Sequence, residues 1–175
     1  RCNIFKDDVR KRFKIDEIDI GPQSRFNIAP TQNIPVIIAK EDKRILTEMK
    51  WGLIPFWAKD PSIGNRMINA RAETIAEKPS FKRALTKRRC LILADGFYEW
   101  KKNGKVKTPM RVTLKGEKPF AFAGLWDTWK EPKTELEIRS CTIITCASNS
   151  FMKKLHHRMP VILKPKTEDL WLNME

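Results

Sequence analysis

Apolar residues recur at every second position in many short segments of the chain. From Ile45 to Trp51, apolar residues alternate with charged or polar ones, which is typical of a strand with one buried face. Continuous apolar runs, with turn residues such as Asn103-Gly104 between them, predict further strands. These strands are expected at residues 34–39, 90–94, 97–101, 109–114, 119–123, 138–146 and 159–163.

Helical spacing is less common. Residues 6–13 are expected to form a short helix, because Val9 and Phe13 stand four apart and two aspartates suit its first turn. A helical pattern over 73–89 is interrupted at Pro79, and further short helices are expected at 149–155 and 167–172. Many short strands, few helices and no strand–helix–strand alternation indicate an α+β fold. Its core is expected to be an antiparallel sheet or open β-barrel with a few short flanking helices.

Length and composition fit one folded unit. The chain has 175 residues, so residues 1–175 are expected to form a single domain, and we expect a monomer. Apolar residues make up 41% and charged residues 32%, which is typical of a globular protein. No apolar run approaches the roughly 18 residues that span a bilayer, so no membrane partner is expected. No glycine-rich nucleotide-binding motif occurs, and no cofactor is expected.

The charge balance is strongly positive. The chain carries 35 Lys plus Arg against 21 Asp plus Glu, a net charge of +14. Such a balance favours a polyanionic partner, most often nucleic acid. A basic surface that only keeps the protein in solution is the alternative that charge alone leaves open.

The cysteine pattern argues against a metal centre. No CxxC pair occurs, and the two histidines are neighbours, whereas a structural zinc site needs four clustered Cys or His ligands. Three of the cysteines lie in apolar, strand-like runs, which indicates small packing residues in a reducing, cytoplasmic compartment. The four cysteines are Cys2, Cys90, Cys141 and Cys146.

Four stretches place polar, reactive or planar side chains among apolar residues, at 50–57, 69–74, 94–100 and 155–160. Each has a plain structural alternative. Glu99 could be the outward residue of an alternating strand, and His156 a hydrogen-bonded structural histidine. Asn69 could cap a helix over Glu73, and Trp57 could belong to the core. Residue spacing alone leaves both sets of interpretations open.

Together these stretches closely resemble the SOS response-associated peptidase (SRAP) family. The matching segments, in family order, are "RFNIAPTQ", "KWGLIPFWAKD", "MINARAET", "EKPSF", "RRCLILADGFYEWKK", "FAFAGLWDTW", "CTIITCASN" and "LHHRMPVIL". They cover essentially all of residues 25–172. The family usually extends further at both ends, so residues before Arg1 and a short C-terminal tail are expected to be missing.

The resemblance implies covalent capture of abasic sites in single-stranded DNA. Family members remove their own initiator Met and then begin with cysteine. The terminal amine forms a Schiff base with the aldehyde of the ring-opened sugar, and the thiol closes a thiazolidine ring. An α-amine has a pKa of about 7.7–8.0, against about 10.4 for lysine, so more of it is nucleophilic near neutral pH. The thiol lies two carbons away, which makes the five-membered ring readily accessible.

The resemblance also implies catalytic roles. Asn69 of "NAR" would orient the reacting terminus or the sugar. Glu99 of "FYEW" would act as general acid/base in sugar-ring opening or Met removal, and its aromatic neighbours would raise its pKa by desolvation. His156 would move protons during Schiff-base formation. His157 stands where the family usually has an acidic residue, so it is a departure from the pattern.

DNA contacts follow from the same resemblance. Arg71 and Arg158 would bind phosphates. Trp57 would stack on an exposed base or wedge at the lesion, because base stacking tolerates any sequence.

The start of the chain admits two alignments. In one, Cys2 is the nucleophile. In the other, which we favour because it preserves more identities, Arg1 is the family's arginine and a DNA contact. Cys2 is then a packing residue and the nucleophile lies upstream of Arg1. Cys2 could react only as the mature N-terminus, because with Arg1 attached its nitrogen is an amide and no thiazolidine can form.

We therefore expect an abasic-site sensor with autopeptidase activity, cytoplasmic and nucleoid-associated when it binds damaged DNA. Two other functions compete. A non-covalent single-stranded nucleic-acid binder would show salt-dependent affinity without a crosslink. A peptidase acting in trans would turn over peptides, but nothing in that chemistry requires a net charge of +14.

Overall fold

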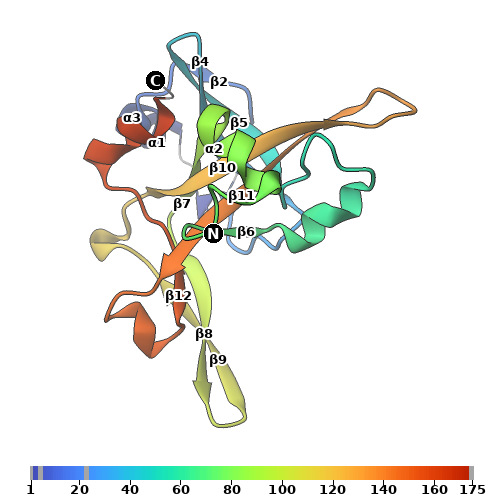
Figure 1. The fold of residues 1–175 in the computed structure, drawn as a ribbon. Coiled ribbons are helices and arrows are strands. Elements are labelled where there is room, and N and C mark those ends of the chain that lie inside the picture. Colours follow the sequence, from blue (N-terminus) through green and yellow to red (C-terminus); the bar gives the residue numbers. More distant parts are fainter. Residues whose placement is uncertain (1, 4–5, 22–23, 174–175) are drawn as a thin grey trace.

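The computed structural model describes residues 2–3, 6–21 and 24–173. Its centre is a ring of five strands (Figure 1), joined in the order β11-β10-β7-β4-β5 and closed by a pairing of β5 with β11. Four of these junctions are antiparallel, and the closing junction is parallel, with Ser140 beside Lys50 and Cys141 beside Trp51. The strands are β4 (Asn33–Lys40), β5 (Lys43–Trp51), β7 (Arg89–Ala94), β10 (Phe120–Lys130) and β11 (Glu137–Ala147).

Shorter strands extend this ring. β2 (Glu17–Ile18) runs parallel to β5, and β12 (Arg158–Pro160) pairs antiparallel with β11. β6 (Asn69–Arg71) runs parallel to β11. β1 (Cys2–Asn3) pairs with β3 (Ser24–Arg25). β8 (Phe97–Asn103) and β9 (Val106–Val112) form a separate hairpin that projects from the barrel in Figure 1.

Helices are few and short. The α-helices are α1 (Lys6–Phe13), α2 (Pro79–Lys87) and α3 (Pro165–Leu172), and the 3₁₀ turns are η1 (Pro61–Arg66), η2 (Lys115–Glu117) and η3 (Met152–Lys154). α2 and α3 each begin with proline, whose fixed φ and missing N–H suit the first helical position. Pro79 therefore starts α2, and residues 73–77 before it form turns instead of the predicted helix.

Alternation along the barrel strands separates two apolar faces. One buried cluster takes residues from all five strands, among them Val36, Met49, Ile92, Phe122 and Cys141, and fills the barrel. The opposite faces of β4 and β7 pack under α1 and α3. α2 covers β10 and β11 through Phe81 and Ala84.

This packing requires a glycine at position 124 of β10. A Cβ atom there would lie 2.7 Å from Ile92 Cδ1 and 2.9 Å from Cys90 Sγ. No side chain fits between them, so a glycine stands in the middle of a strand.

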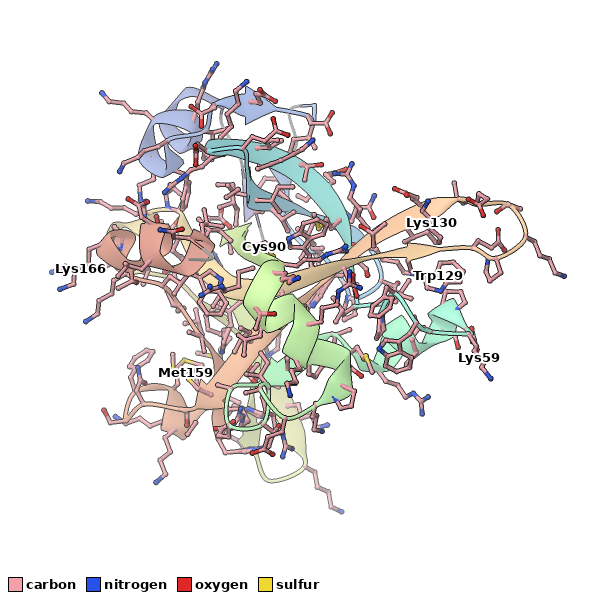
Figure 2. All side chains as sticks on the ribbon, turned by 45° about the horizontal axis from the view of Figure 1, so that its top comes forward. Lys59, Cys90, Trp129, Lys130, Met159 and Lys166 are labelled. Atoms are coloured by element: carbon pink, nitrogen blue, oxygen red, sulfur yellow. The ribbon has the colours of Figure 1, made fainter. Side chains whose placement is uncertain are left out.

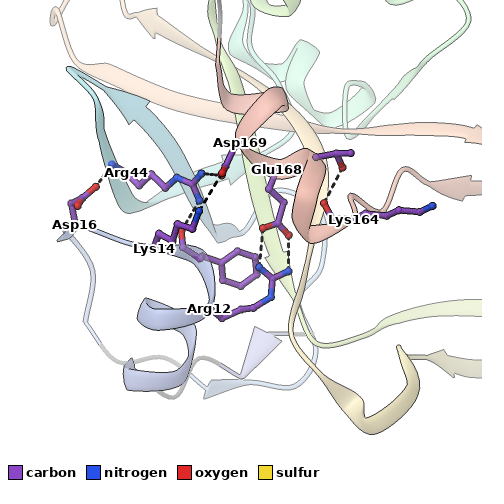
Figure 3. A network of polar contacts seen from close by, with 9 residues as sticks. Arg12, Lys14, Asp16, Arg44, Lys164, Glu168 and Asp169 are labelled. Atoms are coloured by element: carbon purple, nitrogen blue, oxygen red, sulfur yellow. Dashed lines mark hydrogen bonds and ion pairs between the residues drawn. The ribbon is translucent and has the colours of Figure 1, made fainter.

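A polar network joins the outer helices to the barrel (Figure 3). The Arg12 guanidinium of α1 donates to both carboxylate oxygens of Glu168 of α3, at 2.8 and 2.7 Å. Glu168 is only 2% exposed. The neighbouring Asp169 accepts from Arg44 of β5 and from Lys14 Nζ, the latter at 3.3 Å. The network fixes α1 and β5 against α3.

The structure confirms the expected α+β fold with a barrel core and short flanking helices, and adds the parallel junction that completes the ring. In Figure 2, Lys59, Lys130 and Lys166 point outward, whereas Cys90 lies inside. Among the described residues, no helix is long and apolar enough to cross a membrane. Residues 2–3, 6–21 and 24–173 contain no group of three or more His, Cys, Asp or Glu side chains that could hold a metal ion.

Candidate functional site

A cavity of about 1040 Å³ opens beside the barrel. All four stretches singled out from the sequence contribute to it: Trp51 at the end of β5, Asn69 and Arg71, Tyr98 to Trp100, and His156 to Pro160. The loop 26–30 and the barrel residues Ile92 and Phe122 complete the largely apolar wall.

Asn69 reaches the cavity because of the strand that carries it. β6 pairs with β11, with Asn69 beside Ile143 and Ala70 beside Ile144. Ala70 is 1% exposed, so the alternation of a strand places Asn69 and Arg71 together on the open side. Both residues line the cavity. The helix-cap alternative for Asn69 is wrong, because the residue lies in a strand.

Glu99 stands on the β8–β9 hairpin, opposite Met110. It is half-buried between the more exposed Tyr98 and Trp100, and all three line the cavity. Tyr98 Oη donates to the carbonyl of Phe26 at 3.3 Å, which ties the hairpin to the loop across the cavity wall. Glu99 thus lines the same cavity as Asn69.

His156 is held by the backbone through one ring nitrogen. Nδ1 lies 3.1 Å from the Arg158 N–H and 3.1 Å from the Arg158 carbonyl oxygen. Neutral Nδ1 accepts from the N–H, and protonated Nδ1 donates to the carbonyl, so the ring keeps a partner in both protonation states. Its ring lies 4.4 Å from that of His157, centroid to centroid. With Nδ1 occupied, Nε2 is the nitrogen that remains for a ligand.

Arg158 is engaged within the protein. Its guanidinium donates to the two Glu73 carboxylate oxygens at 2.7 and 3.0 Å, and to the Thr145 carbonyl at 2.7 Å. The hydrogen bonds from Arg158 lower the pKa of Glu73 to about 2, and the same pairing raises the pKa of Arg158. Fewer Arg158 donors therefore remain for a phosphate. Arg71 is exposed on the same wall of the cavity.

Trp57 lies apart from the cavity lining. It is 47% exposed, so it is not a core residue, and its neighbour Phe56 is 48% exposed with the Arg83 guanidinium 4.2 Å from its ring centroid. Trp51 does line the cavity, and its indole N–H donates to the Ile68 carbonyl at 2.9 Å. The two tryptophans of this stretch therefore occupy different surfaces.

Cys2 is a buried residue of β1. It is 5% exposed and packs in the cluster that contains Phe13, Leu91 and Leu93. Burial, with a smaller contribution from the Asp95 carboxylate, raises the pKa of its thiol to about 12, so almost no thiolate forms at neutral pH. Arg1 lies outside the described residues.

The strand that holds Cys2 adjoins the cavity. Cys2 is paired with Arg25, which directly precedes the lining residue Phe26. Asp95, whose charge reaches the Cys2 thiol, stands between the lining residues Ala94 and Gly96. The beginning of the described chain and the cavity rim are therefore neighbours.

One lining residue was not singled out from the sequence. Phe26 is 56% exposed and lines the cavity. It stands in the segment "RFNIAPTQ", which resembles the family, so an exposed aromatic in that segment was the available signal. Glu73, the partner of Arg158, could not be found that way because its role depends on side-chain geometry.

Comparison with known proteins assigns the chain to a family. The chain matches the family described as "SOS response associated peptidase (SRAP)" over residues 1–175. It is 48% identical over 172 residues to the Bacillus subtilis "Abasic site processing protein YoqW", covering 95% of this chain and 75% of that protein. It is 51% identical over 170 residues to "Abasic site processing protein YoaM" of the same bacterium, covering 95% and 74%.

A solved structure agrees. The crystal structure of a Bordetella bronchiseptica protein superposes with a TM-score of 0.81 at 25% identity, covering 94% of this chain and 82% of that one. Sequence and fold together show that the chain belongs to the SOS response associated peptidase family.

Proposed function

We propose that this protein detects abasic sites in single-stranded DNA and captures them covalently through an N-terminal cysteine. One observation carries the proposal: Asn69, Glu99 and His156, from three segments far apart in the sequence, line a single cavity. Two Bacillus relatives are named abasic site processing proteins. The net charge of +14 suits a DNA partner.

The reaction is balanced without a cofactor. The ring-opened abasic sugar offers an aldehyde, the terminal amine adds to its carbon, and loss of one water gives the Schiff base. The thiol then adds to the C=N bond, and its proton passes to the nitrogen, which closes the thiazolidine. Proton transfer is the only assistance needed, and the ionisable side chains that line the cavity can supply it.

The cavity residues divide this work. His156 moves protons through Nε2 while its Nδ1 stays bonded to the Arg158 backbone in either protonation state. Glu99, half-buried in the cavity lining, is the general acid/base for sugar-ring opening and for removal of the initiator Met. Asn69 offers an amide that donates and accepts, and so orients the terminus or the sugar.

We place the nucleophile upstream of Arg1 and assign Cys2 to packing. A thiol that is 5% exposed and has its pKa raised to about 12 is poorly suited to attack, and its neighbours are core residues. Cys2 would serve only as the mature N-terminus and after leaving this environment. Because Cys2 pairs with Arg25, next to the lining residue Phe26, a cysteine shortly before Cys2 would have the cavity within reach.

The proposed DNA contacts lie on two surfaces, the cavity lining and the exposed surface that carries Trp57. Arg71 is the principal phosphate ligand in the cavity, and Arg158 supports it from its ion pair with Glu73. Arg1 adds a phosphate contact. Trp57, exposed on the second surface beside Phe56, stacks on a base or wedges beside the lesion.

The test uses the protein made from its natural initiator codon and single-stranded DNA with one abasic site. The wild type should give a heat-stable shifted band on a denaturing gel. Glu99→Gln should slow its formation at least about 100-fold, as expected for loss of a general acid/base. Glu135→Gln, an exposed residue outside the cavity lining, is the matched control and should behave as the wild type.

An intact mass of each variant shows whether the initiator Met is gone, which separates a defect in processing from a defect in capture. DNA binding without any shifted band in the wild type would favour the non-covalent binder. Turnover of an added peptide without a crosslink would favour the peptidase in trans.

A further inference from the structure

A short turn beside the cavity presents an aromatic side chain and two lysines to solvent. Phe151 is 66% exposed, and Lys153 and Lys154 of η3 are exposed as well. Their backbone is fixed, because Asn149 Oδ1 accepts from the Met152 N–H at 2.9 Å and the Lys153 N–H donates to the Asn149 carbonyl at 2.8 Å. Met152, 2% exposed, anchors the turn in the protein.

The turn is continuous with the cavity wall. The Met152 carbonyl accepts from the His156 N–H at 2.9 Å, and the chain then enters β12 through His157 and Arg158. His156, His157 and Arg158 all line the cavity. In Figure 1 the segment before β12 lies at the same end of the molecule as the β8–β9 hairpin, which carries Glu99.

The composition of this surface fits one kind of partner. An exposed aromatic face offers a stacking surface, and any nucleobase can use it. Two neighbouring ammonium groups match the phosphates on either side of a base. The net charge of +14 already points to a polyanion, and an uncharged protein partner would leave both lysines unpaired.

We propose that Phe151, Lys153 and Lys154 form a flanking-strand subsite for the DNA that leaves the cavity. Phe151 stacks on an unpaired base a few nucleotides from the abasic site, and the two lysines contact the adjacent phosphates. The subsite rests on the proposed function for its ligand. It adds affinity for the flanking strand and takes no part in the chemistry at the aldehyde.

The experiment compares DNA lengths. The probes are labelled oligonucleotides of 5 and 15 nucleotides with a central tetrahydrofuran, an abasic analogue without an aldehyde, so binding is measured by fluorescence anisotropy without crosslinking. Phe151→Ala should weaken binding of the longer probe roughly 5- to 150-fold, the range for loss of one stacked base. Lys153→Ala/Lys154→Ala should lower the slope of log affinity against log salt by about 1.4.

Helix α3 offers a matched control surface away from the cavity lining. Leu170 is 71% exposed, and Lys164 and Lys166 are exposed near it in sequence. Leu170→Ala and Lys164→Ala/Lys166→Ala should leave both the affinity and the salt slope within twofold of the wild type.

The outcomes separate this subsite from the proposed function. Crosslinking of the aldehyde-bearing 5-mer by Phe151→Ala at the wild-type rate, with weaker binding of the 15-mer, supports the subsite. Unchanged affinity and salt slope for the 15-mer would overturn it even if the wild type crosslinks normally. A wild-type protein that neither crosslinks the aldehyde-bearing DNA nor binds the tetrahydrofuran probes would overturn the proposed function, and the subsite that rests on it.

Discussion

At the scale of single residues, the site depends on how a few polar groups are held. His156 keeps a backbone partner whether or not Nδ1 is protonated, so its ring can exchange a proton without turning. Arg158 is fixed by Glu73 and Thr145, and thereby holds the backbone groups that His156 uses. Cys2, by contrast, lies in apolar surroundings that suppress thiolate formation.

The Glu73–Arg158 pair makes a prediction about acid stability. The pKa of Glu73 is about 2 in the folded protein, below its ordinary value of 4.5, so the pair stabilises the fold above pH 4.5. This contribution is lost as the pH falls from 4.5 towards 2. Glu73→Gln should therefore lower Tm near neutral pH, and the difference from the wild type should vanish by about pH 2.

Thermal unfolding followed by circular dichroism across this pH range measures the difference. Glu77→Gln, a change at an exposed carboxyl group nearby in the chain, is the control and should give a small difference without this trend. A Tm difference between Glu73→Gln and the wild type that stays constant from pH 7 to pH 2 would contradict the role given to the pair.

At the scale of elements, short strands position the site and ion pairs hold the outer helices. The alternation in β6 directs Asn69 and Arg71 into the cavity, and the β8–β9 hairpin supplies Glu99. α1 and α3 cover the outer faces of β4 and β7, and Arg12 and the buried Glu168 join the two helices.

Breaking this contact should be costly. Arg12→Ala leaves the Glu168 carboxylate, 2% exposed, without its bidentate donor, and should lower the free energy of unfolding by about 3 kcal/mol. Lys14→Ala removes a pair whose side chains are 73% and 57% exposed, and should cost less than about 1 kcal/mol. Urea unfolding of the two variants gives the comparison, and equal losses would show that burial does not govern this network.

Elements were predictable from the sequence to different degrees. The helix at 6–13 has the bounds expected from its spacing and first-turn aspartates. The strand expected at 119–123 continues as β10 to Lys130. Gly124 interrupts the apolar run in the sequence, but it does not end the strand, because close packing against Ile92 and Cys90 requires a glycine there. β6 was not predicted as a strand, since three residues carry too little periodicity and its pairing partner β11 is distant in sequence.

The site was predictable through family resemblance more than through chemistry. Asn69, Glu99 and His156 were named from segments that match the family, and spacing alone did not bring them together. The Arg158–Glu73 pair and the exposure of Phe151 depend on side-chain geometry, which residue patterns do not contain. The parallel junction of β5 and β11 could be learned only from the structure, because residue patterns do not show which strands distant in sequence pair with each other.

At the scale of the whole molecule, the closed barrel supplies a rigid wall and the projecting segments complete the cavity. Strand β1 pairs with β3 next to the lining residue Phe26, and the β8–β9 hairpin contributes Tyr98, Glu99 and Trp100 to the cavity wall. A net charge of +14 would attract single-stranded DNA to the molecule, and under the proposed function the cavity is the one place where the abasic sugar reacts.

The most direct test of this account is mass spectrometry of the adduct formed with abasic single-stranded DNA by the cell-made protein, followed by peptide mapping. We predict one adduct per protein, with the mass of protein plus DNA less one water, on an amino-terminal cysteine that precedes Arg1, and unmodified Cys2. An adduct on a lysine or on internal Cys2, or no adduct at all, would contradict the account.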